Sequence, residues 1–595
     1  MSDLNLGILG NCIIAALVDT EARIVWGCLP RLDGDPVFCA LLDNGPDPER
    51  GGYWSLTLPN GRTREQAYLP NTAVLRTVIG DAEGNAIEIL DFAPRHKQYG
   101  RMYRPPMLVR CVRPLSGRPR IVTHLLPRFQ NGELRPNITR GSNHARYVGP
   151  TQTLRLTTDA PLSYVLEHVP FLLDRPMHFV LGPDEILNAD IAETAGGLLA
   201  RTRDYWRDWA RSLTIPFEWQ DEVIRAAVTL KLCAYEETGA VVAALTTSIP
   251  EAAHSQRNWD YRFCWLRDAY FVIQAMNRLG VTTTMEAYIG YIMDIVGDVE
   301  TQGLGPLFAI TRSADLSERV APALAGYRGM GPVRIGNEAW LQVQNDVYGS
   351  VVLAATHVFF DRRLELADRH GLFEQLERIG SRAVQVWDKP DAGLWELRTR
   401  EHVHTFSAVM CWAACDRLAK IAGVIGRRER SAYWRERADA MHARICAEAW
   451  HEPGGYFASC FGGGDLDASL LLLNELDFLT ADDPRFAATV DAIGTSLRSG
   501  DFLYRYQIPD DFGRPETAFT VCAFWYVEAL TALGRRDEAR DLFGKLLARR
   551  NPLGLLSEDL DWHTGEQWGN FPQTYSMVGL INCAMRLSIG WEEAF

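Results

Sequence analysis

The chain has 595 residues, of which 47% are hydrophobic and 23% are charged, a balance typical of a soluble globular protein with a large core. Its 61 basic and 75 acidic residues give a net charge of −14, which disfavours binding to nucleic acid or to anionic membranes. No window is long and apolar enough to cross a bilayer, and no basic residue precedes the apolar stretch near the N-terminus. We therefore expect neither a membrane span nor a secretory signal.

The twelve cysteines are scattered along the chain, without the paired spacing of a zinc site. Cys411 and Cys415 would share one face of a helix, where two small core residues are a simpler interpretation than a metal site. A chain of this length does not need disulfides for stability. The cysteines therefore predict reduced thiols, no metal and a cytoplasmic location.

Residues 1–185 are predicted to form a β domain. Short runs rich in β-branched and aromatic residues recur there, separated by turn signals such as Asn60-Gly61 and Gly182-Pro183. No amphipathic pattern of helical length interrupts these runs. Many regularly spaced strands without crossover helices indicate an antiparallel β-sandwich.

After residue 185 the apolar period changes, and residues 186–215 are predicted to be a helical linker. Residues 216–595 contain about twelve segments in which apolar residues recur at intervals of three and four. These segments are 221–237, 267–280, 282–297, 338–360, 372–388, 404–423, 427–449, 467–474, 483–498, 516–533, 536–548 and 574–588. Six helical pairs can close into an (α/α)6 barrel. A linear solenoid is the alternative, although no repeat of fixed length is present.

Five long loops are predicted between these helices, and all are rich in aromatic, charged and glycine residues. Loops of this length in a compact domain are usually functional. If they alternate with helical pairs, they lie on one face of the barrel and form one mouth lined with aromatic rings and carboxylates. The loops are 239–266, 298–337, 389–403, 499–515 and 549–573.

The densest group of candidate residues is the segment RNWDYRFCWLRDAY, residues 257–270. Tyr261 and Trp265 can stack on the apolar faces of sugar rings, while Arg267 and Asp268 offer a donor and an acceptor to neighbouring hydroxyls. Each residue taken alone also fits a core aromatic or an ion pair in a first helical turn. The cluster as a whole favours a polar binding site.

Glu396 follows Trp395 directly, just before a predicted helix. An indole that desolvates a carboxyl group raises its pKa, which suits a general acid. A glutamate on a surface loop fits this segment equally well. His402 and His404 have no third ligand beside them, so we interpret them as loop or helix-entry residues rather than a metal site.

Glu558 belongs to an acidic segment with Asp559, Asp561 and Glu566, followed by Trp568. A carboxylate here could polarise a water molecule. An acidic calcium loop and a simple turn cap are the alternatives, although the segment lacks the glycine of an EF-hand at its sixth position.

Two further segments carry candidate residues. Trp340 lies near a predicted helix start, and Arg505 and Tyr506 lie in a predicted loop. The chain has no nucleophile elbow, no phosphate-binding loop motif and no dinucleotide fingerprint.

The string NWDYRFCWLRDAY, followed in order by NDVYG, GLWELR, LLSED and GNFPQ, resembles glycoside hydrolase family 15. That family includes glucoamylases, glucodextranases and bacterial α,α-trehalases, and the N-terminal region resembles the β domain of its bacterial trehalase-like members. The resemblance implies a β-sandwich, a linker and an (α/α)6 barrel. It also implies inverting hydrolysis of α-glucosides, with β-D-glucose released from the non-reducing end and no cofactor.

The resemblance also implies roles for individual residues. Glu396 matches the general acid and Glu558 the general base, while Tyr261 matches a tyrosine that positions the attacking water. The residues expected to bind the substrate are Tyr261, Trp265, Arg267, Asp268, Trp340, Trp395, Arg505, Tyr506 and Trp568.

The expected substrate is a small α-glucoside. We expect α,α-trehalase activity ahead of a glucoamylase or isomaltose-type activity, because neither a signal peptide nor a starch-binding module is recognisable. A disaccharide phosphorylase would need a phosphate site in place of Glu558, and a non-catalytic sugar-binding protein would not need both carboxylates. The sequence predicts no nucleic-acid or membrane partner and does not fix the oligomeric state.

Overall fold

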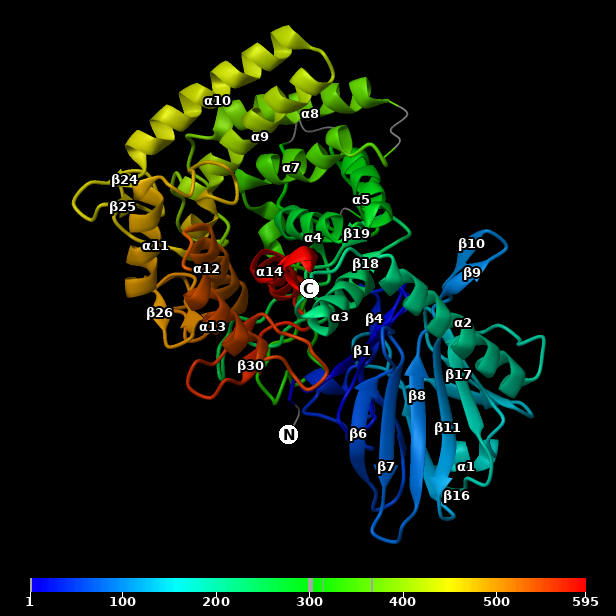
Figure 1. The fold of residues 1–595 in the computed structure, drawn as a ribbon. Helices are drawn as coiled ribbons and strands as arrows, with labels where there is room; N and C mark the ends of the chain where they lie inside the picture. The colour runs from blue at the N-terminus through cyan, green and yellow to red at the C-terminus, as the bar shows by residue number, and fades with distance from the viewer. Residues whose placement is uncertain (1–2, 298–302, 314, 365–367) are drawn as a thin grey trace.

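The computed structural model describes residues 3–297, 303–313, 315–364 and 368–595. Residues 298–302 and 314 of the predicted loop 298–337 lie outside this description. The N-terminal part consists of strands and the C-terminal part of helices, and the two parts lie side by side (Figure 1).

Two antiparallel sheets form the N-terminal part of the described chain. In the first, neighbouring strands run in the order β1-β2-β3-β5-β12-β16, and β4 pairs with β3. In the second, the order is β13-β14-β15-β17-β11-β8-β7-β6. The first sheet comprises β1 Gly7–Gly10, β2 Ala15–Val18, β3 Ile24–Leu29, β4 Asp35–Phe38, β5 Tyr53–Thr57, β12 Arg120–Leu126 and β16 Phe171–Leu172. The second comprises β6 Arg62–Tyr68, β7 Leu75–Gly80, β8 Ala86–Phe92, β11 Leu108–Ser116, β13 Asn137–Arg140, β14 His144–Val148, β15 Thr153–Thr158 and β17 Met177–Pro183. The smaller elements are η1 Ala40–Leu42, the hairpin of β9 His96–Gln98 and β10 Arg101–Tyr103, and α1 Leu162–Glu167.

Strand alternation explains how the second sheet buries both of its faces. On β17, Phe179 and Leu181 join the main core, whereas Val180 points the other way and packs with Ala195 and Leu198. The last two residues belong to α2 (Ile191–Arg211), the helix between the strands and the barrel. The segment 186–215, predicted as a helical linker, therefore contains one helix, α2, which covers the outer face of the sheet (Figure 1).

The helices of the C-terminal part form two concentric rings. Among the described elements, α4, α7, α9, η3, α12 and α14 contact one another in this order, and α14 returns to α4, so the inner ring is closed. The intervening helices α3, α5, α8, α10, α11 and α13 lie outside it. This arrangement is the predicted (α/α)6 barrel and not a linear solenoid. The helices are α3 Gln220–Leu232, α4 Leu266–Arg278, α5 Thr282–Ile295, α7 Asp346–Phe360, α8 Arg369–Val386, α9 Thr405–Val424, α10 Arg428–Glu448, η3 Ala468–Leu473, α11 Pro484–Ser496, α12 Thr520–Ala532, α13 Arg536–Leu547 and α14 Thr574–Leu587.

Short elements connect these helices. They are the 3-10 helices η2 Glu338–Leu341 and η4 Trp591–Glu593, and the strands β18 Ala234–Tyr235, β19 Ala240–Val241, β20 Cys264–Trp265, β21 Leu307–Phe308, β22 Arg319–Val320, β23 Arg334–Ile335, β24 Trp450–His451, β25 Tyr456–Phe457, β26 Arg498–Ser499, β27 Phe502–Leu503, β28 Ala518–Phe519, β29 Asp559–Leu560 and β30 Gln567–Trp568.

One predicted helix is wrong at its start. The segment 338–360 divides into η2 and α7, because the backbone of Gln342 is extended and the backbone amide of Asn345 donates to Asp391 Oδ2 at 2.7 Å. The apolar period alone does not reveal this tertiary bond. The break places Gln344 and Asp346 beside Arg267, where both bind its guanidinium.

The β part contacts two of the loops at the barrel mouth. The indole nitrogen of Trp26 donates to the carbonyl of Leu245 at 2.8 Å, and Asn551 donates to the carbonyls of Leu4 and Leu6 at 3.0 and 2.9 Å. The strands therefore support the loops that follow α3 and α13.

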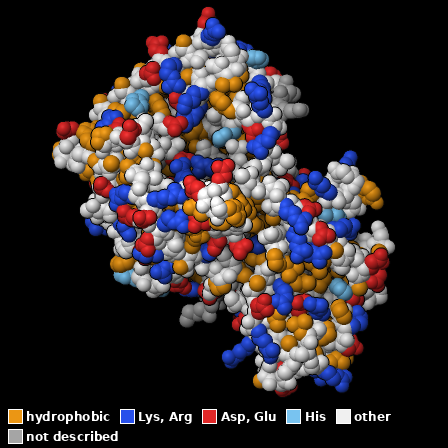
Figure 2. Space-filling model, viewed as in Figure 1, with side chains coloured by type: hydrophobic (Ala, Val, Ile, Leu, Met, Phe, Trp, Pro, Cys, Tyr) orange, Lys and Arg blue, Asp and Glu red, His pale blue; other side chains and the backbone are white. Residues whose placement is uncertain are grey.

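Acidic and basic side chains are interspersed over the face seen in Figure 2. In the described part of the chain, no helix has both the length and the apolar character that a bilayer crossing requires.

Candidate active site

A cavity of about 290 Å³ opens between the loops at one end of the barrel. Each of the five predicted loop segments contributes to its wall, with residues from 243–259, Asn337, 394–398, 505–512 and Glu558. The expectation that these loops share one mouth is confirmed.

Glu396 lies on one wall of this cavity, at a tight turn. Its φ angle is +60° and its amide donates to the carbonyl of Gly393 at 3.2 Å. Its carboxylate accepts a hydrogen bond from the indole of Trp265 at 2.6 Å and a longer one from Arg267 at 3.4 Å. With 26% of its side chain exposed, the carboxylate remains accessible from the cavity.

The indole bonded to Glu396 is therefore that of Trp265, although Trp395 is its neighbour in sequence. The indole of Trp395 donates instead to Asp467 Oδ2 at 3.0 Å and packs edge-on against Tyr506 and Phe519. Trp395 still lines the cavity, but as an apolar wall. The sequence argument placed the indole of Trp395 against the Glu396 carboxyl group, whereas the indole that bonds to this group is that of Trp265.

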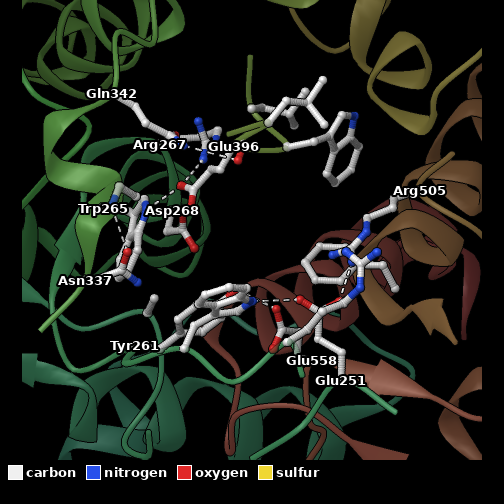
Figure 3. A pocket seen from close by; sticks show the side chains of 18 of the residues that line it. Glu251, Tyr261, Trp265, Arg267, Asp268, Asn337, Gln342, Glu396, Arg505 and Glu558 are labelled. Carbon is white, nitrogen blue, oxygen red and sulfur yellow. Dashed lines mark hydrogen bonds and ion pairs between the residues drawn. The ribbon is translucent and has the colours of Figure 1, made fainter. Parts of the chain in front are cut away.

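Arg267 and Asp268 lie beside Glu396, in the first turn of α4 (Figure 3). Arg267 donates to Gln344 at 2.8 Å and pairs with Asp346 at 3.0 Å. The carboxyl group of Asp268 also lines the cavity, and burial raises its pKa to about 7 against the opposing effect of Arg267. Both residues can offer hydrogen bonds to a sugar.

Glu558 lies on the opposite wall, immediately before the short strand β29, and only 1% of the residue is exposed. The hydroxyl of Tyr261 donates to its Oε1 at 2.6 Å and the backbone amide of Asn570 to its Oε2 at 3.2 Å. Burial, and then the negative charge of Glu251, raise the pKa of Glu558 above its ordinary value, while Tyr261 and Arg505 oppose them.

Gly569 fixes the position of this carboxylate. It has a φ of +74°, and a Cβ atom built on it would lie 2.6 Å from Glu558 Cβ and 2.7 Å from Oε2. Only glycine both adopts this backbone angle readily and leaves room for the glutamate.

Figure 3 shows Glu396 and Glu558 on facing sides of the cavity, with Tyr261 beside Glu558. Two carboxyl groups that face each other across a pocket can act on opposite sides of one glycosidic bond. One can protonate the leaving oxygen while the other activates a water molecule.

Three predicted substrate-binding residues lie outside the cavity lining. Trp340 packs with the apolar cluster that contains Trp265. Tyr506 packs edge-on against Trp395 and donates to Asp510, and Trp568 packs edge-on against Tyr327. Arg505 does line the cavity, but its guanidinium pairs with Glu251.

Sequence reasoning missed Glu251, which lines the cavity and is only 4% exposed. Its only signal was its place in the predicted loop 239–266, a few residues before the aromatic cluster. Gln342 and Tyr575 also line the cavity without having been singled out.

The acidic residues after Glu558 do not converge. Asp559 accepts a hydrogen bond from Thr517 at 3.1 Å, Asp561 from the amide of His563 at 2.8 Å, and Glu566 pairs with Arg328 at 2.6 Å. Across the described ranges, no group of three or more His, Cys, Asp or Glu side chains is arranged to hold a metal ion. All twelve cysteines are free thiols.

A closed double ring of helices with two carboxyl groups facing each other across its mouth defines a class of sugar-cleaving enzymes. Comparison with known families agrees, because the model of glycosyl hydrolases family 15 matches residues 219–585 and that of the trehalase-like N-terminal domain matches residues 5–161. The chain belongs to glycosyl hydrolases family 15 and is a glycoside hydrolase.

Several relatives resemble the chain over nearly its whole length. A trehalase of Mycolicibacterium smegmatis is 32% identical, covering 99% of this chain and 91% of that protein. A trehalase of Thermoplasma volcanium is 31% identical, and the match covers 99% of this chain and 93% of that protein. Among solved structures, a bacterial glucoamylase complexed with acarbose has a TM-score of 0.70 at 14% identity, covering 98% of this chain and 94% of that one, and shows the same fold.

Proposed function

We propose that the protein is an α,α-trehalase that hydrolyses trehalose with inversion at one anomeric carbon. The observation that carries this proposal is the placement of Glu396 and Glu558 on facing walls of one cavity (Figure 3). The choice of trehalose is supported by the full-length relatives that are named trehalases.

In this mechanism Glu396 donates a proton to the glycosidic oxygen as the bond to the anomeric carbon breaks. Glu558 removes a proton from a water molecule that attacks this carbon from the opposite side, and inverting enzymes leave about 6.5–9.5 Å between the two carboxyl groups for that water. Tyr261, bonded to Glu558 at 2.6 Å, fixes the base. Arg267 and Asp268 hold the hydroxyl groups of the glucose unit that is attacked.

The size of the cavity supports a small substrate. Its volume of about 290 Å³ is just below the range of about 300–1,000 Å³ for small-molecule pockets. A disaccharide suits such a cavity better than a polysaccharide chain does.

A glucoamylase-type activity on maltooligosaccharides or isomaltose is the second candidate, favoured by the shared fold with the bacterial glucoamylase. Time-resolved NMR of the products separates the two. Trehalose should yield equal initial amounts of β-glucose, from the attacked unit, and α-glucose, from the leaving unit. Cleavage of maltotriose without cleavage of trehalose would contradict the trehalase proposal, and release of a sugar phosphate only when phosphate is added would indicate a phosphorylase.

We also propose a cytoplasmic location, which the twelve free thiols support because reduced cysteines persist in a reducing compartment. Fractionation of the source cells checks this, and recovery of the enzyme outside the cell would contradict it.

A further inference from the structure

The wall next to Glu558 contains a third carboxylate, that of Glu251. Its Oε1 accepts a hydrogen bond from the indole of Trp259 at 3.2 Å, and its Oε2 pairs with Arg505. The backbone of the same residue is also fixed, because Thr517 donates to its carbonyl at 2.9 Å. Glu251 and Glu558 lie next to each other in Figure 3.

This cluster holds more buried acids than cations. Glu251, Glu558 and Asp559 are 4%, 1% and 2% exposed, and Arg505, the cation that acts on all three, is 9% exposed. Arg257 lies 4.0 Å from Glu251, but its guanidinium already pairs with Asp510 through two hydrogen bonds of 2.7 and 2.6 Å. The guanidinium of Arg505 is therefore shared by neighbouring carboxyl groups, and Glu251 holds it directly.

We propose that Glu251 is a positioning residue of the reaction, which binds Arg505 and so keeps this guanidinium from forming an ion pair with the catalytic base Glu558. Glu558 then keeps Tyr261 and the amide of Asn570 as its bonded partners, with its carboxylate available to a water molecule. This inference rests on the proposed role of Glu558 as general base.

Electrostatics supports this role. The groups that face Glu558 are Tyr261, Glu251, Arg505 and Asp559, and the charge of Glu251 contributes to raising the pKa of Glu558 and that of Asp559. A base of higher pKa accepts a proton more readily once it is ionised, but it is protonated and inactive at low pH. Activity should therefore fall as the pH decreases through the pKa of Glu558.

The test is the dependence of kcat/KM on pH in Glu251→Gln. The amide keeps the size of the side chain and removes its charge, so the pKa of Glu558 falls and Arg505 is free to pair with it. We expect the acidic limb of the profile to move to lower pH by about one unit or more. Because Arg505 then pairs with the ionised carboxylate, kcat on the plateau above the limb should fall at least tenfold, with a smaller change in KM. Glu251→Asp, which keeps the charge, should keep the limb near its wild-type position.

Arg505→Gln should move the acidic limb in the opposite direction. This variant also tests the proposal if Glu251→Gln does not fold. Loss of this cation raises the pKa of Glu558, so the acidic limb should move to higher pH. Asp511→Asn is the matched control, because Asp511 also lines the cavity but bonds to Arg398 and Thr399. The acidic limb of the pH profile of this variant should not move.

A residue with a merely structural role changes the rate or the stability without moving the acidic limb of the pH profile. If the acidic limb of folded Glu251→Gln or of Arg505→Gln stays at its wild-type position, the proposed role of Glu251 is wrong, even if the rate falls. Glu558→Gln separates the two proposals. If it is inactive while the limb of Glu251→Gln stays in place, only the inference about Glu251 fails. If Glu558→Gln keeps a near-normal rate, both fail.

Discussion

The two proposed catalytic carboxyl groups are held in different ways. Glu396 lies at a turn with a left-handed backbone, and 26% of its side chain is exposed. Glu558 is only 1% exposed, is bonded to Tyr261 and to the amide of Asn570, and packs against Gly569, where a Cβ atom would not fit. An acid must reach a leaving oxygen whose position varies with the substrate. A base must hold one water molecule in line with the bond, which needs a rigid carboxylate.

Replacing either glutamate with glutamine removes proton transfer and keeps the shape of the side chain. We expect Glu396→Gln and Glu558→Gln each to lower kcat for trehalose at least a hundredfold, since a positioned acid or base contributes about 10²–10⁴-fold. KM should change only a few-fold, because hydroxyl binding by Arg267 and Asp268 is retained. Steady-state kinetics checks this, and near-normal turnover in either variant would refute its role.

Gly569→Ala should disable the base through a steric contact. The new Cβ would lie 2.6 Å from Glu558 Cβ, so the glutamate must move, and we expect kcat to fall at least tenfold. Gly534→Ala is the control, because Gly534 has a similar φ of +76° but nothing lies within 4 Å of the added Cβ. Thermal unfolding should show that both variants are less stable by about 1–2 kcal/mol, because alanine adopts this left-handed backbone angle less readily than glycine. Equal kcat in the two variants would contradict the steric argument.

Asp268 should make stability depend on pH. Burial raises its pKa from 3.8 to about 7, so in this pH interval the folded state keeps a proton that the unfolded state has lost. Stability is therefore lost as the pH rises from 3.8 to about 7. Asp268→Asn removes this penalty, and we expect it to raise Tm relative to wild type more at pH 8 than at pH 4 while lowering kcat/KM. A difference in Tm that is the same at both pH values would contradict this.

At the scale of elements, the loops of the barrel mouth are tied to one another. Asp511, in the loop before α12, accepts hydrogen bonds from the amide of Arg398 at 2.6 Å and from the hydroxyl of Thr399. These residues follow the proposed acid in its own loop. The loop that carries Glu396 is thus attached to the loop before α12, which also lines the cavity.

Asp511→Ala should release this attachment. Because Glu396 and its Trp265 partner remain, we expect KM for trehalose to rise several-fold and kcat to fall less. The control is Asp511→Asn, whose amide oxygen can still accept one of the two bonds and should have an intermediate KM. A wild-type KM in the alanine variant would show that the connection does not shape the cavity.

At the scale of the whole molecule, the strands and the barrel share one hydrophobic core. A single contiguous cluster of buried residues includes Leu4 and Trp26 from the β part and Val223 and Leu587 from the helical part. Together with the bond from Trp26 to Leu245, this continuity makes the β part a support for the loops at the barrel mouth and not a separate module.

Residues 216–595 expressed alone should therefore fail to form a soluble, active barrel, because the apolar surface covered by the strands becomes exposed. Co-expression with residues 1–215 should restore part of the activity. Soluble yield and trehalose hydrolysis measure the outcome, and an active isolated barrel would show that the β part is dispensable.

The sequence alone determined the features that depend on residues close together in the chain. Strand alternation, the helical period after residue 185 and the long aromatic loops predicted both halves of the fold, and the order of the motifs indicated the family. Each of these is a pattern within a short stretch of chain, where neighbouring residues determine the structure.

Only the tertiary structure decided which side chains meet. It placed the indole of Trp265 on Glu396, 131 positions away, and Glu251 on Arg505, 254 positions away. It also left Trp340, Tyr506 and Trp568 outside the lining of the cavity. Such contacts depend on how separate helices and loops pack around the ring, and no periodic pattern in the sequence records distances between residues that are far apart in the chain.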